Sequence, residues 1–189
     1  FFKQKTAYEI SQCDWSSDVC SSDLLGSVIG CALAAAAAPF FPSIEIVEAH
    51  RESKVDSPSG TAVRTAELIA AAREKVGPVQ SPHVDQRARG QQVASVAIHS
   101  LRRPGVVARQ ETILSGAGES LTIGHDTIYP TAAYAPGIRI AIAAAREARG
   151  VIVGLDSFID IGVRTRPARP EAPIADGDVS GQVAGVTSA

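Results

Sequence analysis

The chain has 189 residues, of which 45% are hydrophobic and 20% charged, and its formal net charge is −2. This length suits one sizeable core with part of a second. The charge balance and the aromatic content of 5% disfavour nucleic acid and an anionic membrane as partners. Three cysteines, at positions 13, 20 and 31, match neither a zinc-binding spacing nor a disulfide framework, so we expect a reducing, cytoplasmic setting.

The first 24 residues show no sustained helical or strand periodicity and contain the unusual run DWSSDVCSSD. They resemble a translated sequencing-adapter read-through. We therefore interpret segment 1–24 as non-native or disordered and leave it out of the fold. The natural protein is accordingly expected to extend further towards its N-terminus than this sequence does.

Residues 24–41, LLGSVIGCALAAAAAPFF, are rich in alanine and glycine and nearly uncharged. As a membrane span they would be at the short end of the required length, and as a signal peptide they lack a preceding basic stretch. The composition favours a small-residue helix buried against a sheet. A membrane-anchored or secreted domain stays open as the alternative.

A strand and a helix are predicted next. Residues 43–50, SIEIVEAH, alternate isoleucine with other side chains, which is typical of a strand. After a polar loop, Ser57 as N-cap and Pro58 at the first helical position predict a helix over SPSGTAVRTAELIAAAREKV. Gly77-Pro78 is expected to end that helix.

The second half of the chain adds strands, a helix and a tail. After a polar connection come three strand-like runs, VASVAIHSL, VVARQETILS and ESLTIGHD, the last two joined by the hairpin signal Gly116-Ala117-Gly118. A helix over 136–149 and a hydrophobic strand and turn over 150–161 follow, and residues 163–189 form an aperiodic, disordered tail. These elements predict an α+β fold, with a mixed sheet of about four strands and flanking helices.

The stretch HRESKVDSPSGTA, residues 50–62, concentrates groups that suit an anion. His50 ends a strand, a histidine can exchange a proton near neutral pH, and Lys54 supplies a full positive charge. The helix start offers free backbone N–H groups with positive dipole character. Gly60 allows close approach of a ligand to the backbone, and Thr61 adds a hydroxyl. This combination predicts a carboxylate or phosphate site with proton transfer to an anionic substrate.

Each part of this stretch also has a structural explanation, because helix starts, strand-end histidines and loop lysines commonly bind nothing. Glu48 and Asp56 are expected to orient the loop rather than react, and we assign no role to His99 or His125. Neither G-x-G-x-x-G after a strand nor G-x-x-x-x-G-K occurs. Cofactor-binding residues are therefore unknown, and no metal ligands are predicted.

Residues 48–62, EAHRESKVDSPSGTA, resemble the signature of the dihydrodipicolinate reductase (4-hydroxy-tetrahydrodipicolinate reductase) family, E-x-H-H-x-x-K-x-D-x-P-S-G-T-A. VAIHSLRRPGVVARQETIL resembles the family's V-x-S-x-R-x-x-G-x-x-x-x-Q-E strand pair. GESLTIGHDT and YAPGIRIAI resemble its closing strand and return helix, and LGSVIGCAL is similar to the segment that opens its substrate domain. The resemblance covers roughly residues 25–162.

The resemblance implies reduction of 4-hydroxy-tetrahydrodipicolinate to tetrahydrodipicolinate with NADH or NADPH, in lysine and diaminopimelate biosynthesis. On this sequence it implies His50 as proton donor, Lys54 as its assistant and as a carboxylate ligand, and Gly60 and Thr61 as a carboxylate site. The expected small-molecule partner is this dicarboxylate. The family is usually a homotetramer, which implies an interface formed by the strands at 93–101, 107–115 and 119–126.

The sequence departs from the family pattern in two places and lacks one part of it. Arg51 stands at the second histidine of the pair; it keeps a cation for substrate binding and loses a titratable group. Between the last strand and the return helix the family often has an arginine, and Pro130 lies near the position where that arginine would fall. The N-terminal Rossmann domain has no counterpart, so we expect residues 25–135 to be the substrate-binding and oligomerisation domain. Residues 136–162 would be the helix and strand that return to the absent domain.

Two expectations follow from this organisation. The chain as written should be a fragment that binds no nicotinamide cofactor and shows no reductase activity alone. The alternative is a non-catalytic oligomerisation or binding module, which keeps the interface and has no substrate affinity.

Overall fold

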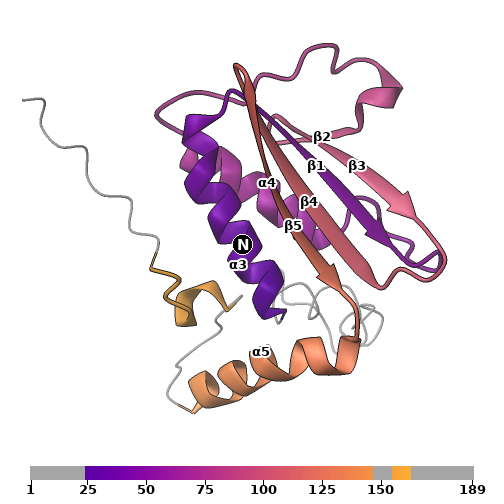
Figure 1. Ribbon diagram of the computed structural model, residues 1–189, viewed down its shortest axis with the longest axis vertical. Coiled ribbons are helices and arrows are strands. Elements are labelled where there is room, and N and C mark those ends of the chain that lie inside the picture. Colours follow the sequence, from indigo (N-terminus) through magenta and orange to yellow (C-terminus); the bar gives the residue numbers. More distant parts are fainter. Residues whose placement is uncertain (1–23, 147–154, 163–189) are drawn as a thin grey trace, which may run out of the picture.

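The computed structural model describes residues 24–146 and 155–162. Its β-strands form one mixed, five-stranded sheet in the order β2-β3-β1-β4-β5 (Figure 1). The predicted α+β class is confirmed. In chain order the α-helices, 3₁₀ helices (η) and strands are α3 (Leu25–Ala37), η1 (Ala38–Phe40), β1 (Ser43–His50), α4 (Gly60–Ala72), η2 (Arg87–Arg89), β2 (Gln91–Val93), β3 (Val96–Arg102), β4 (Ala108–Gly116), β5 (Glu119–Thr127), α5 (Pro130–Ala145) and η3 (Asp156–Phe158).

The core lies between the sheet and two helices, α3 and α4, that cover one of its faces. The buried positions of α3, Ser27, Cys31 and Ala34, recur at the three- and four-residue spacing of one helix face. Their small side chains let the backbone of α3 approach α4 and the sheet. The prediction of a small-residue helix buried against a sheet is confirmed. The core cluster consists of Ala34, Ala38, Ile44, Ile46, Ala62, Ala66, Ile69, Val79, Val96, Ile98 and Leu114.

The described helices offer no membrane span, because none of them is both long and apolar enough to cross a bilayer. The stretch that raised the question, residues 24–41, is divided between α3, the short η1 and the approach to β1.

β1 and β3 are parallel and are joined through α4, whereas the other neighbouring strands are antiparallel. In the parallel register Glu48 pairs with Ser100 and His50 pairs with Arg102. Parallel strands end at the same edge of a sheet, and alternate residues share a face. The carboxyl ends of β1 and β3 therefore lie side by side. Glu48, His50 and their register partners are on the face that α4 covers.

The helix after β1 begins and ends at other residues than predicted. Its N-cap is Ser59 rather than Ser57, because Ser59 keeps an extended backbone and its hydroxyl accepts a hydrogen bond from the N–H of Ala62 at 3.3 Å. The helix stops at Ala72, before the predicted end. There Arg73 turns inwards, and its guanidinium donates to backbone carbonyls of the following loop and of the η1 segment after α3. These are the carbonyls of Gly77, Pro78, Ala38 and Phe41.

The run VASVAIHSL, predicted as one strand, contains a hairpin turn. Ala94 and Ser95 both have positive φ, 48° and 69°, and connect β2 to β3 as a two-residue turn with Val93 opposite Val96. The predicted sheet of about four strands thereby gains a short fifth strand at its edge.

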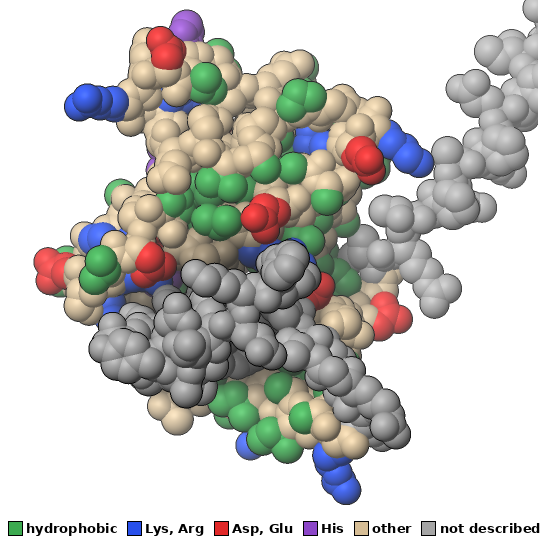
Figure 2. All heavy atoms as spheres, turned by 180° about the vertical axis from the view of Figure 1, so that it is seen from behind, with side chains coloured by type: hydrophobic (Ala, Val, Ile, Leu, Met, Phe, Trp, Pro, Cys, Tyr) green, Lys and Arg blue, Asp and Glu red, His purple; other side chains and the backbone are tan. Residues whose placement is uncertain are grey.

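The end of the described chain differs from prediction in where the helix begins. α5 starts at Pro130, at a first helical position that needs no N–H donor, and Pro136, the predicted start, lies inside the helix. Its exposed side chains include Ile138 and Ile142, the latter 63% exposed, and hydrophobic side chains gather at this lower end of the molecule (Figure 2). Of the segment predicted as non-native, 1–24, only Leu24 is described, and it is the buried N-cap of α3. The predicted tail 163–189, residues 147–149 of the predicted helix and residues 150–154 of the predicted last strand lie outside the described residues.

Candidate functional site

His50 lies at the end of β1, and its ring is held by a buried carboxylate. Nδ1 of His50 is 2.6 Å from Oε2 of Glu48, whose side chain is 0% exposed, while the His50 side chain is 17% exposed. The alternation of β1 places both residues on the α4 side of the sheet. A carboxylate at Nδ1 keeps the proton on that nitrogen and leaves Nε2 available to a ligand.

Glu48 is surrounded by donors. Arg102 places Nη1 3.1 Å from each of its carboxylate oxygens, and the backbone N–H of Ser59 donates to Oε1 at 3.3 Å. Burial by itself would raise the pKa of Glu48. Hydrogen bonds from His50, Ser100 and Arg102, together with the charge on His50, outweigh burial and hold that pKa below its usual range. Glu48 is therefore an ionised, buried anion that orients His50. The role expected of it was to orient the loop, and its one described backbone contact of that kind is the N–H of Ser59.

Lys54 lies in the loop between β1 and α4, and its side chain is 8% exposed. Its ammonium forms a 2.8 Å ion pair with Asp56. Arg51, the first residue after β1, is exposed, and its Nε donates to the hydroxyl of Ser53 at 3.1 Å. The loop thus holds one cation close to the protein body and a second one near solvent.

Gly60 and Thr61 form the first turn of α4, directly after the Ser59 cap. Their N–H groups precede the first bonds within the helix, so they are available to an anion. Gly60 is exposed and Thr61 half-buried, which leaves the turn accessible. The carbonyl of Thr61 accepts a 2.8 Å hydrogen bond from the hydroxyl of Thr65, one turn further along.

Arg102 is a site residue that the physical reading of the sequence missed. It comes from β3, about fifty positions after His50, so it could not be seen in the contiguous motif. The signal that could have found it is the order strand, helix, strand. A right-handed crossover through one helix puts the carboxyl ends of the two strands side by side, and Arg102 then falls next to His50.

An open groove of about 450 Å³ runs beside this site, along the edge of β3 and the turn before α4. Ser100, which is hydrogen-bonded to Glu48, contributes to its wall, whereas His50 and Lys54 do not line it. The full lining is Ser57, Pro58, Arg87, Ala88, Gly90, Gln91, Ile98, His99 and Ser100.

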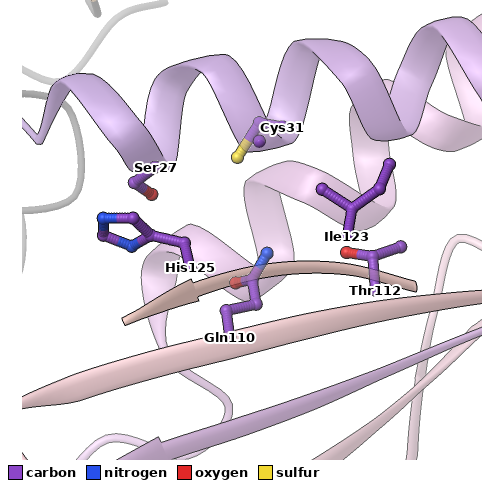
Figure 3. Close-up of a pocket in the computed structure, with 7 residues that line it drawn as sticks. Ser27, Cys31, Gln110, Thr112, Ile123 and His125 are labelled. Carbon is purple, nitrogen blue, oxygen red and sulfur yellow. The ribbon is translucent and has the colours of Figure 1, made fainter. Parts of the chain in front are cut away.

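A smaller cavity, of about 10 Å³, lies between α3 and the sheet (Figure 3). There Cys31 of α3 points towards Gln110 of β4, and the ring of His125 from β5 lies beside Ser27 of α3 (Figure 3). Burial raises the pKa of the Cys31 thiol and lowers the pKa of His125. The volume accommodates about one water molecule, so this cavity does not receive a substrate.

Thr65 determines the hydrogen bonding beside that cavity. Its hydroxyl proton goes to Thr61, so it accepts from Nε2 of Gln110 at 2.9 Å and from the thiol of Cys31 at 3.0 Å. Cys31 is therefore a structural thiol that supports α4.

His99, to which no role was assigned, faces away from the helices. Its Nε2 lies 2.8 Å from Oε2 of Glu45, and Arg89 binds the other oxygen of the same carboxylate. Burial acts to raise the pKa of Glu45, but these two partners hold it below its usual range. This cluster lies on the sheet face that α3 and α4 leave uncovered.

The described residues do not fit a metal ion or a dinucleotide. Within 24–146 and 155–162 no group of three or more His, Cys, Asp or Glu side chains could hold a metal. The described β–α–β unit, β1–α4–β3, has Gly60 but not the glycine-rich turn that admits a pyrophosphate.

Comparison with known proteins points to one family. The family model described as "Dihydrodipicolinate reductase, C-terminus" matches residues 26–159. A 4-hydroxy-tetrahydrodipicolinate reductase of Clavibacter michiganensis subsp. michiganensis is 59% identical over 172 residues, covering 87% of this chain and 62% of the relative. The corresponding protein of Nocardia farcinica is 43% identical over 141 residues, covering 72% and 56%.

A solved structure has the same fold. It carries the description "Dipicolinate bound Dihydrodipicolinate reductase from Paenisporosarcina sp. TG-14", and it matches with a TM-score of 0.64 and 30% identity over 82% of this chain and 61% of that chain. The chain thus spans about three fifths of the length of the Clavibacter relative and of this structure.

Proposed function

The chain belongs to the dihydrodipicolinate reductase family, and we propose that it is the substrate-binding part of a 4-hydroxy-tetrahydrodipicolinate reductase. The complete enzyme would reduce 4-hydroxy-tetrahydrodipicolinate to tetrahydrodipicolinate with NADH or NADPH, in the cytoplasm, for lysine and diaminopimelate biosynthesis. The observation that carries this proposal is the buried Glu48 carboxylate, which binds His50 next to a helix N-terminus.

His50 acts as the proton donor in this proposal. With Nδ1 bound to Glu48 at 2.6 Å, the proton available to a substrate is the one on Nε2 of the imidazolium. The negative charge of Glu48 stabilises that cation and fixes the plane of the ring. The substrate ring receives this proton on the atom next to the reduced carbon, and His50 is left neutral.

The carboxylates of the substrate are bound by the groups that follow His50. Lys54 offers a charge, and the first turn of α4 offers the N–H groups of Gly60 and Thr61. Charge-assisted hydrogen bonds of this kind are shorter and stronger than neutral ones. Arg51, exposed at the mouth of the loop, is positioned to contact the second carboxylate of a dicarboxylate.

The nicotinamide cofactor is assigned to no residue described here, since the turn before α4 does not fit a dinucleotide. When bound to the complete enzyme, the cofactor supplies the hydride. We expect this chain by itself to bind neither NADH nor NADPH and to have no reductase activity.

The remaining surfaces support a larger assembly. α5 exposes Ile138 and Ile142, as a helix that returns to a second domain would. The sheet face opposite α3 and α4 exposes Leu101 and is the proposed interface of a homotetramer. A non-catalytic module that uses this face alone is the second candidate function.

Titration calorimetry on this chain tests the proposal. Dipicolinate, the ligand named for the related structure, should bind with one site per chain, and NADH should give no binding heat. Absence of dipicolinate binding by a folded chain would reject the substrate site and favour the oligomerisation module. Measurable NADH binding would contradict the proposal that the cofactor site lies elsewhere.

A further inference from the structure

Arg102 is the last residue of β3 and the register partner of His50, the last residue of β1. The backbone reinforces this pairing, because the N–H of Arg103 donates to the carbonyl of His50 at 2.9 Å. The two strands therefore end together, and the side chain of Arg102 extends towards the loop that carries Lys54.

The guanidinium of Arg102 contacts two parts of the site at once. Nη1 lies 3.1 Å from both oxygens of Glu48 and also donates to the carbonyl of Leu101 at 2.7 Å. Nε donates to the carbonyl of Lys54 at 3.2 Å, and Nη2 donates to the carbonyl of Asp56. One side of the group thus holds the partner of His50, and the other holds the loop on both sides of residue 55.

These contacts need an arginine. A guanidinium has five N–H donors in a rigid plane and no acceptor, so it can donate to a carboxylate and to two carbonyls in fixed directions. A lysine ammonium would supply the charge that the buried Glu48 requires. It has three donors at a single point and could not reach the carbonyls of Lys54 and Asp56 at the same time.

From this geometry we propose that Arg102 is a positioning residue, which fixes the proton donor His50 and the carboxylate ligand Lys54 in one arrangement. The inference deepens the proposed function of the site and rests on it. Arg102 acts through Glu48 on the ring of His50 and through two backbone carbonyls on Lys54. Among the hydrogen bonds described for Arg102, none is made to the side chain of His50 or to that of Lys54.

Two substitutions separate these two actions. Arg102→Lys keeps a positive charge beside Glu48 and removes the contacts with the loop, whereas Arg102→Met removes both. The matched control is Arg103→Lys, which changes the exposed neighbouring arginine in the same way. Circular dichroism and thermal unfolding establish that each variant is folded.

The first measurement is dipicolinate affinity, with ¹⁵N NMR of the His50 ring as a spectroscopic signature. In Arg102→Lys we expect affinity to fall about tenfold, the equivalent of about one hydrogen bond to a charged group, while the Nδ1–H form of His50 is retained. In Arg102→Met both the affinity for dipicolinate and the Nδ1–H form of His50 should be lost. Arg103→Lys should match the wild type. Unchanged affinity in a folded Arg102→Lys chain would overturn the proposal.

The second measurement needs no ligand. Amide hydrogen exchange over residues 52–57 should be faster in Arg102→Lys than in the wild type and in Arg103→Lys, since the loop has lost its anchors on β3. Equal exchange in all three proteins overturns the positioning role. A wild type that binds no dipicolinate, with the expected exchange pattern, would instead reject the proposed function and leave the structural part of the inference supported.

Discussion

His50 and Glu48, two residues apart on one strand, form a hydrogen bond of 2.6 Å in which the carboxylate is 0% exposed. A histidine held in this way presents Nε2 to a ligand in a fixed direction. It also depends on the protonation state of its partner.

Replacing His50 removes the proposed proton donor and leaves the carboxylate site intact. In the complete reductase, His50→Gln should lower kcat by about 10²–10⁴, the usual contribution of general acid catalysis, with cofactor affinity unchanged. Steady-state kinetics and cofactor titration measure these quantities. His83→Asn is a suitable control, because His83 is exposed and has positive φ, which asparagine tolerates. Normal turnover of His50→Gln would refute the assignment.

Replacing Lys54 tests the carboxylate site in the chain itself. Lys54→Ala removes an ammonium whose side chain is 8% exposed, so the dissociation constant for dipicolinate should rise about 10- to 100-fold, as for a lost charged hydrogen bond. Lys75→Ala, at an exposed lysine beyond α4, should leave affinity unchanged. Equal dissociation constants for the two variants, measured by calorimetry, would show that Lys54 is a purely structural residue.

Acid should destabilise the protein through Glu48. Its pKa in the folded state is lowered from the usual 4.5, so its stabilising contribution is present above pH 4.5 and is lost as pH falls through the lower folded value. Glu48→Gln should therefore flatten the decline of the unfolding free energy below about pH 5. It should also lower stability at pH 7, because Arg102 loses its charged partner.

Urea unfolding at several pH values measures this dependence. Glu45→Gln should flatten the acid decline in the same direction, since the pKa of Glu45 is also lowered. Glu119→Gln, at the exposed start of β5, is the control and should leave the pH profile as it is. A Glu48→Gln profile parallel to that of the wild type would contradict the prediction.

Gly90 and Gly105 are two glycines with positive φ that differ in the space around them. Both have positive φ, 72° and 75°, but a Cβ at Gly90 would lie 2.6 Å from the carbonyl oxygen of Ile98, whereas one at Gly105 would meet nothing within 4 Å. Gly105→Ala should cost about 1 kcal/mol from the left-handed conformation. Gly90→Ala should cost about 2–4 kcal/mol, since its φ of 72° and ψ of −177° lie in a region that only glycine adopts readily and overpacking against Ile98 is added. Equal losses in urea unfolding would show that the edge of β3 yields freely.

The parts of the site that lie together in the sequence could be predicted, and the part that tertiary structure supplies could not. His50, Lys54, Gly60 and Thr61 fall within one motif, where a strand end, a polar loop and a helix start are each recognisable. Arg102 joins them through parallel pairing of β1 and β3, which periodicity within a single strand does not reveal.

The prediction of local structure from the sequence was wrong at two positions, the N-cap of α4 and the turn between β2 and β3. Ser57 before a proline and Ser59 both suit an N-cap, and the hydroxyl that reaches the N–H of Ala62 decides in favour of Ser59. The β2–β3 turn uses Ala94 and Ser95 at positive φ, where asparagine and glycine are the usual signals. Pairing with β3 overrides that local preference.

The parallel pairing that brings Arg102 to His50 also makes ligand binding a reporter of folding. The sequence stretch from Glu48 to Thr61 contains the proposed donor and the carboxylate ligands, yet a synthetic peptide of that stretch would lack the strand against which its loop is ordered. A ligand of the proposed site would bind the native state and not the unfolded one, so raising its concentration should raise the unfolding midpoint by mass action. The ligand affinity of the native state and the apparent free energy of unfolding are then thermodynamically linked.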